Sequence, residues 1–249
     1  MKNNISDTRR SFIKSMAAMT VLFSISPFKV LANISKPHNN MKKQKETLLL
    51  GMVVFDGFQL LDTFGPLEMF GSLKGKVEIV LIGENSGKVK SSAGPVVMID
   101  HTFNEVDKFD ILMIPGGGGT RREVNNEKFL ESMRKLAKQT PNVASICTGA
   151  AILAKAGIID GLNATTNKRA FAWATSQSDQ VKWIKEARWV EDGKFFTSSG
   201  ISAGTDMALA LIQKLFGRDE AIRIANSAEY EWNEDSHHDP FAKLNGLVD

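Results

Sequence analysis

The sequence contains a single cysteine, Cys147, so it cannot form a disulfide bond within one chain. In an oxidising compartment, such a thiol is buried, protected by its surroundings or used in chemistry. The chain has four histidines, and none lies between His101 and His237. Its Cys and His residues do not recur at the short spacings that are typical of a metal site. We therefore expect neither a metal ion nor another cofactor.

The scarcity of histidine also restricts the reactions that the cysteine could carry out. A cysteine hydrolase of the familiar kind needs an imidazole that accepts the thiol proton and returns it to the leaving group. His101 is expected in a loop at a strand end, and His237 and His238 lie in an acidic C-terminal segment. Two adjacent histidines could bind a metal, but they are more often solvated surface. A Cys–His dyad is therefore not favoured.

The N-terminal region has no apolar stretch of the ~20 residues that a membrane span requires. Residues 15–28 form a short uncharged stretch that follows Arg9, Arg10 and a further basic residue. This pattern predicts a twin-arginine export signal over residues 1–32, cleaved after Ala32. An uncleaved amphipathic anchor is the alternative. We expect export to the periplasm, with no stable membrane insertion after cleavage.

The charge of the chain gives no indication of a nucleic-acid partner. The formal net charge is +3, but residues 1–32 contain five Lys or Arg and one Asp, so the remainder carries −1. A basic surface stripe is not evident in that remainder. Residues 33–46 are polar and lysine-rich and are predicted to form a linker. Residues 47–249 are numerous enough for one well-buried domain.

Apolar runs alternate with helical periodicities through most of that domain. The continuous apolar run at residues 48–55 predicts a strand that is buried on both faces. Further candidate strands are residues 77–82, 96–99, 111–114 and 143–146. Helical spacing is found at residues 60–73, 127–138, 150–155 and 203–216. The alternation predicts a doubly wound α/β fold, in which ligands bind beyond the carboxyl ends of the strands. We expect the loops that begin at Asp56, Pro115 and Cys147 to meet there.

Cys147 lies where an apolar run meets a stretch of small residues. Residues 143–146 read as a buried strand, and residues 148–151 read as the start of a helix. A strand-to-helix corner can hold a nucleophile on a sharp turn, facing the N–H groups of the helix. These groups are expected to stabilise a thiolate and lower its pKa. The alternative is a buried structural cysteine that behaves as a small apolar residue.

Two further segments carry groups that could assist the cysteine. The glycine run at residues 116–119 has neither the Lys-Ser/Thr ending of a P-loop nor the spacing of a dinucleotide fingerprint. It could expose N–H groups to a developing negative charge, or it could simply form a tight loop. Asp62 could cap a helix N-terminus. If its carboxyl instead lies beside Cys147 in a partly desolvated pocket, its pKa rises and it can transfer a proton.

Five blocks of sequence, in the same order, resemble the ThiJ/PfpI superfamily and within it most closely the isonitrile hydratase branch. The resemblance extends over residues 48–241, and its blocks are residues 51–62, 114–117, 145–149, 164–166 and 197–206. It implies a flavodoxin-like three-layer sandwich with a mostly parallel sheet and a nucleophile elbow, usually dimeric. It also implies catalytic roles for Asp62, Cys147 and Thr148, and an oxyanion- and substrate-binding role for Gly116, Gly117 and Thr148.

Two departures distinguish this sequence from its relatives. Protease-like members carry histidine directly after the cysteine, where this chain has Thr148. Related sequences commonly continue Ala-Thr-Thr with His-Trp, whereas Asn167 and Lys168 follow Thr166 in this chain. A histidine at the edge of the pocket is thus replaced by Asn167.

The resemblance predicts an enzyme that adds water to a small-molecule isonitrile. Attack by Cys147 would give a thioimidate, and Asp62 would serve both the addition and the hydrolysis to an N-substituted formamide. An exported protein in which the cysteine is reversibly oxidised is one alternative. A cysteine amidase or peptidase is another, and it would need His237 or His238 from a partner subunit.

Overall fold

The computed structural model describes residues 47–249, which form an α/β fold around a seven-stranded sheet. The order of strands across the sheet is β10-β11-β7-β6-β1-β2-β5, and every neighbouring pair is parallel except β10 and β11. The strands are β1 (Leu48–Val53), β2 (Val77–Gly83), β5 (His101–Thr102), β6 (Ile111–Ile114), β7 (Asn142–Ser145), β10 (Trp189–Asp192) and β11 (Phe195–Ser198). The predicted signal and linker lie outside the described residues.

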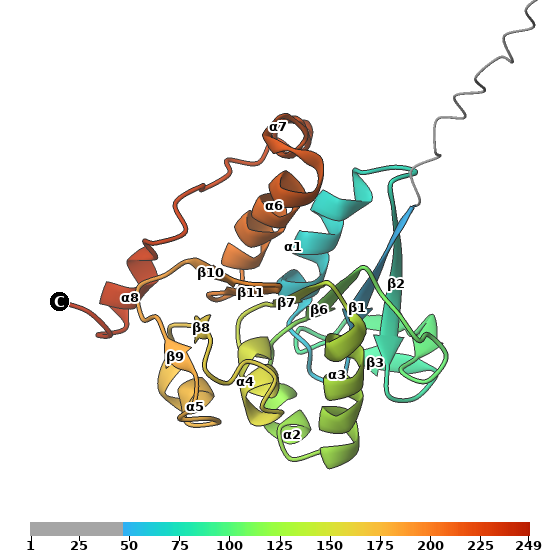
Figure 1. The fold of residues 1–249 in the computed structure, drawn as a ribbon, viewed down its shortest axis with the longest axis horizontal. Coiled ribbons are helices and arrows are strands. Elements are labelled where there is room, and N and C mark those ends of the chain that lie inside the picture. Colours follow the sequence, from blue (N-terminus) through green and yellow to red (C-terminus); the bar gives the residue numbers. More distant parts are fainter. Residues whose placement is uncertain (1–46) are drawn as a thin grey trace, which may run out of the picture. The chain divides into compact units, whose positions relative to one another are not determined.

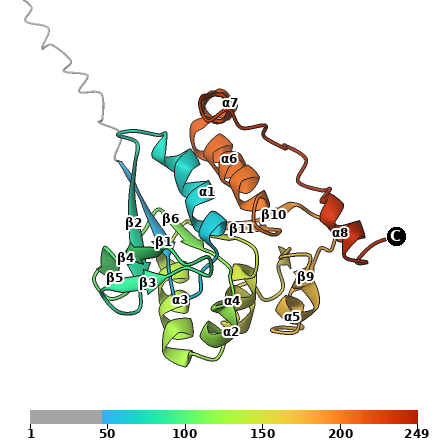
Figure 2. The same ribbon diagram turned by 180° about the vertical axis from the view of Figure 1, so that it is seen from behind.

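Helices cover both faces of this sheet. Helices α1 and α6 lie on one face, with α7 beyond them, and α3 and α4 lie on the other with α2 (Figures 1 and 2). The helices are α1 (Leu60–Gly71), α2 (Thr120–Glu123), α3 (Glu127–Gln139), α4 (Gly149–Lys155), α5 (Phe171–Thr175), α6 (Ala203–Phe216), α7 (Arg218–Ser227) and α8 (Pro240–Leu244). The predicted three-layer α/β fold is confirmed.

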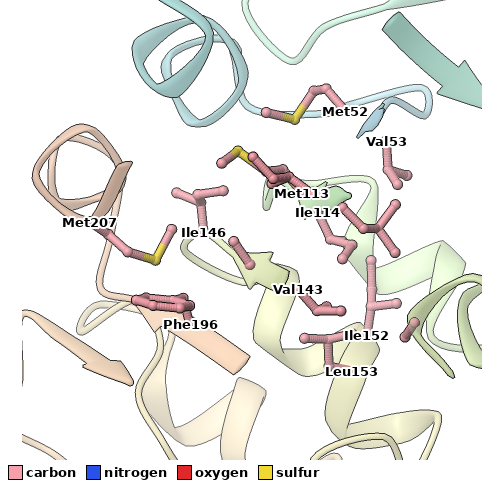
Figure 3. Packing of buried hydrophobic residues seen from close by; sticks show 14 of the residues in the cluster. Met52, Val53, Met113, Ile114, Val143, Ile146, Ile152, Leu153, Phe196 and Met207 are labelled. Carbon is pink, nitrogen blue, oxygen red and sulfur yellow. The ribbon is translucent and has the colours of Figure 1, made fainter. Parts of the chain in front are cut away.

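The central strands are apolar because helices bury both of their faces. All four residues of β6 are buried, and so are the last four of β1. Figure 3 shows Val143 of β7 beside Ile152 and Leu153 of α4, and Phe196 of β11 beside Met207 of α6. Each such side chain contributes about 1.5 to 3 kcal/mol when it leaves water. The core therefore fixes both helix layers against the sheet.

One predicted strand lies outside the main sheet. The apolar run at residues 96–99 forms β4 (Val96–Met98), which pairs antiparallel with β3 (Lys88–Lys90) in a separate hairpin. Val96 and Met98 are each more than half exposed. The placement of this run in the doubly wound sheet was therefore wrong, because an apolar run of four residues does not reveal which strand will pair with it.

The edge formed by β10 and β11 was not predicted. These strands form a hairpin in which Asp192 pairs with Phe195, and Gly193 has a φ of 61° in the turn. An Asp-Gly pair between two short β-prone runs is a recognisable hairpin signal. A further pair, β8 (Asn163–Ala164) and β9 (Lys182–Trp183), flanks α5. Within residues 47–249, no helix has the length and hydropathy of a membrane span.

The strand order brings three loops together at one end of the sheet. Strands β1, β6 and β7 are neighbours, with Met113 of β6 paired to both Met52 and Ala144. Their carboxyl ends lead to Asp56, Pro115 and Ile146, so the segments that follow begin side by side. The predicted convergence of these loops is confirmed. Strand β2 lies on one side of β1 and β6 on the other, so the strand order reverses at β1, which is where α/β sheets bind ligands.

Candidate active site

Cys147 occupies the sharp corner between β7 and α4. Its φ is 57°, a left-handed conformation that is uncommon for residues other than glycine. The backbone N–H of Cys147 lies 3.2 Å from the carbonyl oxygens of both Ser198, the last residue of the adjacent strand β11, and Ser199, which follows it. These contacts hold the strained corner in place. The side chain is 6% exposed, so a small part of it reaches the surface.

Three N–H groups surround the sulfur atom. The backbone N–H groups of Thr148 and Ile201 and the side-chain amide of Asn167 donate hydrogen bonds to Sγ, and each lowers the pKa of the thiol. Burial and the negative charge of Asp62 act in the opposite direction and dominate, raising the pKa of Cys147 to about 12. The expected lowering of the thiol pKa by the helix N-terminus is therefore wrong. Desolvation outweighs the donors because the sulfur is almost enclosed.

Asp62 is completely buried beneath this corner. Its Oδ2 accepts a hydrogen bond of 2.9 Å from the N–H of Gly116, and its Oδ1 has no hydrogen-bond partner among the described residues. Burial raises the pKa of Asp62 to about 7, against the lowering effect of the bonds from Gly116 and Cys147. The helix N-cap is Gln59, and Asp62 is the third residue of α1. The N-cap interpretation is therefore wrong, and the carboxyl lies in the site.

Asp62 and Cys147 act on one another electrostatically. The thiol donates a hydrogen bond to the carboxylate, which lowers the pKa of Asp62, and the carboxylate charge raises the pKa of Cys147. Above pH 7 the pair consequently retains one proton, held mainly on sulfur. Transfer of that proton to Asp62 produces a thiolate beside a neutral carboxylic acid. This geometry can supply a nucleophile and a proton donor in the same step.

The glycine loop is packed too tightly for a side chain at Gly116 and at Gly117. A Cβ added to Gly116 would lie 2.5 Å from the nitrogen of Thr148, and one added to Gly117 would lie 2.3 Å from the oxygen of Gly57. Gly117 also has a φ of 124°. The N–H of Gly116 is donated to Asp62, and that of Gly117 is donated to Thr148 Oγ1 at 3.1 Å. In this structure both amides position the site, and their predicted contact with a developing negative charge stays a prediction.

The hydroxyl of Thr148 contacts the glycine loop rather than the carboxyl of Asp62. Besides the N–H of Gly117, its Oγ1 lies 3.2 Å from the hydroxyl of Thr120. Thr120 in turn donates a 2.7 Å hydrogen bond to the carbonyl of Gly117. Thr148 thus connects the elbow to the loop that holds Asp62. Its backbone N–H, by contrast, points at the sulfur of Cys147.

The site opens into a cavity of about 530 Å³. Cys147 and Thr148 lie in its wall, together with Asn167, Trp173 and Ile201. A cavity of this size accommodates a small organic molecule. The predicted residues Asp62, Gly116, Gly117, Cys147 and Thr148 are thus all brought together. His237 and His238 are exposed on a separate segment, where His238 forms an ion pair of 3.1 Å with Glu186.

Sequence reasoning missed the two other residues that contact the sulfur. Asn167 was noted only as a replacement for histidine, and Ile201 only as part of a resembling block. Ile201 has a φ of 48°, which directs its N–H to the sulfur. A Cβ on Gly200 would lie 2.1 Å from the amide nitrogen of Asn167, so a larger residue there would require the Asn167 side chain to move. A β-branched residue is rare at positive φ, so no local sequence pattern marked the contact of Ile201.

A parallel α/β sheet with a cysteine on a nucleophile elbow defines a class of proteins, and comparisons with known sequences identify the family. Residues 50–214 match the DJ-1/PfpI family. The chain is 35% identical over 189 residues to isonitrile hydratase from Pseudomonas putida, covering 74% of this chain and 78% of that protein. The chain belongs to the DJ-1/PfpI family.

Solved structures agree with this assignment. A ThiJ/PfpI family protein from Pseudomonas syringae superposes with a TM-score of 0.68 and 26% identity, covering 82% of this chain and 84% of the other. The DJ-1beta protein of Drosophila melanogaster superposes with a TM-score of 0.67 and 21% identity, covering 75% of this chain and 100% of the other. The second similarity concerns the fold alone.

Proposed function

We propose that this protein is a cysteine-dependent hydratase that adds water to an isonitrile and releases an N-substituted formamide. The observation that carries the proposal is the pairing of Cys147 with a buried carboxyl, Asp62, whose pKa is raised to about 7. The similarity to the isonitrile hydratase of Pseudomonas putida supports the same reaction. A histidine does not contact the sulfur among the described residues, and the reaction proposed does not require one.

The first half of the reaction uses the single proton that Cys147 and Asp62 share. As the sulfur attacks the isonitrile carbon, the thiol proton passes to Asp62. Asp62 then delivers that proton to the same carbon, giving a thioimidate, R–N=CH–S–Cys. The isonitrile adds as a whole and no group departs. An imidazole acid for a leaving amine is therefore unnecessary.

The second half uses Asp62, now a carboxylate, as a general base. Asp62 takes a proton from water while the hydroxide adds to the thioimidate carbon, and Asp62 then delivers that proton to the nitrogen. The resulting tetrahedral intermediate, R–NH–CH(OH)–S–Cys, collapses to R–NH–CHO and restores the shared proton. The N–H groups of Thr148 and Ile201 and the amide of Asn167 stabilise the sulfur anion as it leaves.

The test is turnover of a neutral aryl isonitrile by the purified protein, followed by chromatography of the formamide. We expect Cys147→Ala to abolish turnover and Asp62→Asn to lower it about 10²- to 10⁴-fold, because general acid–base catalysis contributes that much. Asp179→Asn, at an exposed carboxyl outside the site, serves as the matched control and should retain full activity. Formamide production that survives Cys147→Ala would refute the proposal.

Mass spectrometry supplies a second readout for the same proposal. A thioimidate adds the complete mass of the isonitrile to Cys147, whereas acyl transfer from an amide would add only the acyl portion. We expect the complete mass on protein that is quenched in acid during turnover. An adduct on any other residue, with Cys147 unmodified, would contradict the mechanism.

The structure weakens the two other functions predicted from sequence. Peroxide reacts with thiolates, and the raised pKa of Cys147 together with its burial leaves little thiolate at neutral pH. An amidase would need the imidazole of His237 or His238 from a partner subunit at the sulfur, because within this chain Asn167 is the side chain that donates to it. Glyoxal and amide substrates, tested with the same protein, are therefore expected to turn over poorly.

A further inference from the structure

The cavity above Cys147 has two arginines in its wall and no acidic residue among the described residues that line it. Arg121 is the second residue of α2, directly after the glycine loop, and Arg169 precedes α5. Both side chains are exposed toward solvent. A cavity with positive charge alone raises the local concentration of anions and disfavours cations.

Arg121 is held over the cavity by an aromatic side chain. Its guanidinium carbon lies 4.2 Å from the ring centroid of Trp173, which lines the same cavity. Stacking on a ring orients a guanidinium while leaving its in-plane N–H groups free to donate. Among residues 47–249, neither Arg121 nor Arg169 forms an ion pair or a side-chain hydrogen bond. Their donors are available to a ligand.

The adjacent Arg122, in the same helix, has a structural role. Its guanidinium donates to the carbonyl of Asp56 at 2.9 Å and pairs with Glu123. Arg122 thus secures the loop after β1, and its donors are used within the protein. The contrast assigns a different role to Arg121, which is aligned by Trp173 but bound to no acceptor.

We infer that the cavity selects substrates that carry a carboxylate or a comparable oxyanion on a compact aromatic or apolar frame, bound by Arg121 and Arg169. The frame would contact Ala170, Trp173 and Ile201, and the reacting carbon would face Cys147. Arginine suits this task because its planar fork can donate two parallel hydrogen bonds to one carboxylate. The inference deepens the proposed function and rests on it for the nature of the reacting group.

A matched pair of substrates tests the selection. 4-Isocyanobenzoate and its methyl ester share one frame and one reacting carbon but differ in charge. We expect a higher kcat/KM for the acid, and Arg121→Gln or Arg169→Gln to lower it roughly tenfold, the size of one charge-assisted contact. In the same variants, kcat/KM for the ester should change less than about twofold. Arg121→Lys should recover part of the loss in kcat/KM for the acid, because it restores the positive charge.

Lys155→Gln is the matched control, because it removes one positive charge from an exposed position in the last turn of α4. This variant should leave kcat/KM unchanged for both the acid and the ester. An equal kcat/KM for acid and ester, or equal losses for both in the arginine variants, would overturn the anion selection.

A binding measurement separates failure of this inference from failure of the proposed reaction. 4-Formamidobenzoate should slow the alkylation of Cys147 by iodoacetamide more than its methyl ester does, and Arg121→Gln should remove the difference. Arginine-dependent protection without turnover of either isonitrile would uphold the anion site and refute the hydratase. Turnover with no preference in either measurement would refute the anion site and uphold the hydratase.

Discussion

Asp62 and Cys147 share a proton because burial raises the pKa of both groups. A carboxyl at the surface, with a pKa of about 4, would be too weak a base to take the thiol proton. In the site, the N–H of Gly116 and the thiol of Cys147 are donors to the Asp62 carboxyl, and its Oδ1 has no hydrogen-bond partner among the described residues. That weak solvation keeps its pKa close to neutrality. The same carboxyl can then act as an acid in the first half of the reaction and as a base in the second.

The pKa of Asp62 predicts the pH dependence of the reaction. Below pH 7 both groups are protonated, so Asp62 cannot accept the thiol proton, and kcat/KM for a neutral isonitrile should fall about tenfold per pH unit. Above pH 7 the pair carries one proton and the rate should level off. The measurement is initial rates between pH 5 and pH 9. A flat profile, or a rate that falls as the pH rises through 7, would contradict the shared-proton mechanism.

Asn167 also affects the pH profile of kcat/KM, because its side-chain amide does not titrate. Its amide donates a hydrogen bond to the sulfur without changing its charge across this pH range. A histidine at that position would introduce a second titrating group beside the sulfur. The profile of this protein should consequently have a single inflection between pH 5 and pH 9.

At the scale of elements, the site depends on the close packing of three segments that follow three neighbouring strands. The loop after β6 touches α1 through Asp62 and touches α4 through Thr148. At Gly116 and Gly117 these contacts leave no room for a side chain. The position of Asp62 is therefore set by the backbone of Gly116.

Gly116→Ala is expected to lower turnover about 10²-fold, because the added Cβ would lie 2.5 Å from the nitrogen of Thr148 and 2.9 Å from Asp62 Oδ2. Displacing catalytic groups by about 1 Å has an effect of that size. Gly118→Ala is the matched control in the same loop, since its Cβ would have no heavy atom within 4 Å. Kinetics and thermal unfolding of both variants check the prediction. Equal activity in the two variants would contradict it.

The elements themselves were largely predictable from periodicity. Helices α3 and α6 are close to the predicted bounds, because each has a clear apolar stripe over three turns or more. The β10–β11 hairpin was missed, as was the pairing of β4 outside the main sheet. Short strands carry little pattern of their own, and their partners are set by contacts that no local window contains.

At the scale of the whole molecule, Asp62 also affects stability. Between its unfolded pKa of 3.8 and its folded pKa of about 7, the folded protein holds a proton that the unfolded chain has lost. The contribution of Asp62 to the free energy of unfolding is therefore greatest below pH 3.8 and decreases as pH rises to about 7. Above that pH, the fold contains a buried negative charge.

Asp62→Asn is expected to raise the free energy of unfolding relative to the original protein, and the gain should grow by on the order of 4 kcal/mol between pH 4 and pH 8. Denaturant unfolding at both pH values measures it. Asp179→Asn, at an exposed carboxyl, should show little growth because water already solvates that charge. A gain for Asp62→Asn that does not depend on pH would contradict the burial of an ionisable carboxyl.

Assembly and export stay predictions. The homodimer implied by the resemblance would have apolar side chains available on α1, where Leu61 is 45% exposed and Phe64 is 40% exposed. Light scattering of the purified protein would test it. The export signal over residues 1–32 lies outside the described residues, and cell fractionation would test delivery to the periplasm.

The sequence by itself determined the alternation of strands and helices, the elbow at Cys147 and the family, because apolar spacing and short motifs are local properties of the chain. Tertiary structure decided the protonation of the site. Asp62 meets Gly116 across 54 positions of sequence, and Asn167 and Ile201 reach the sulfur from other segments. A pKa follows the solvent and charges around a group, and those are fixed only when distant segments pack together.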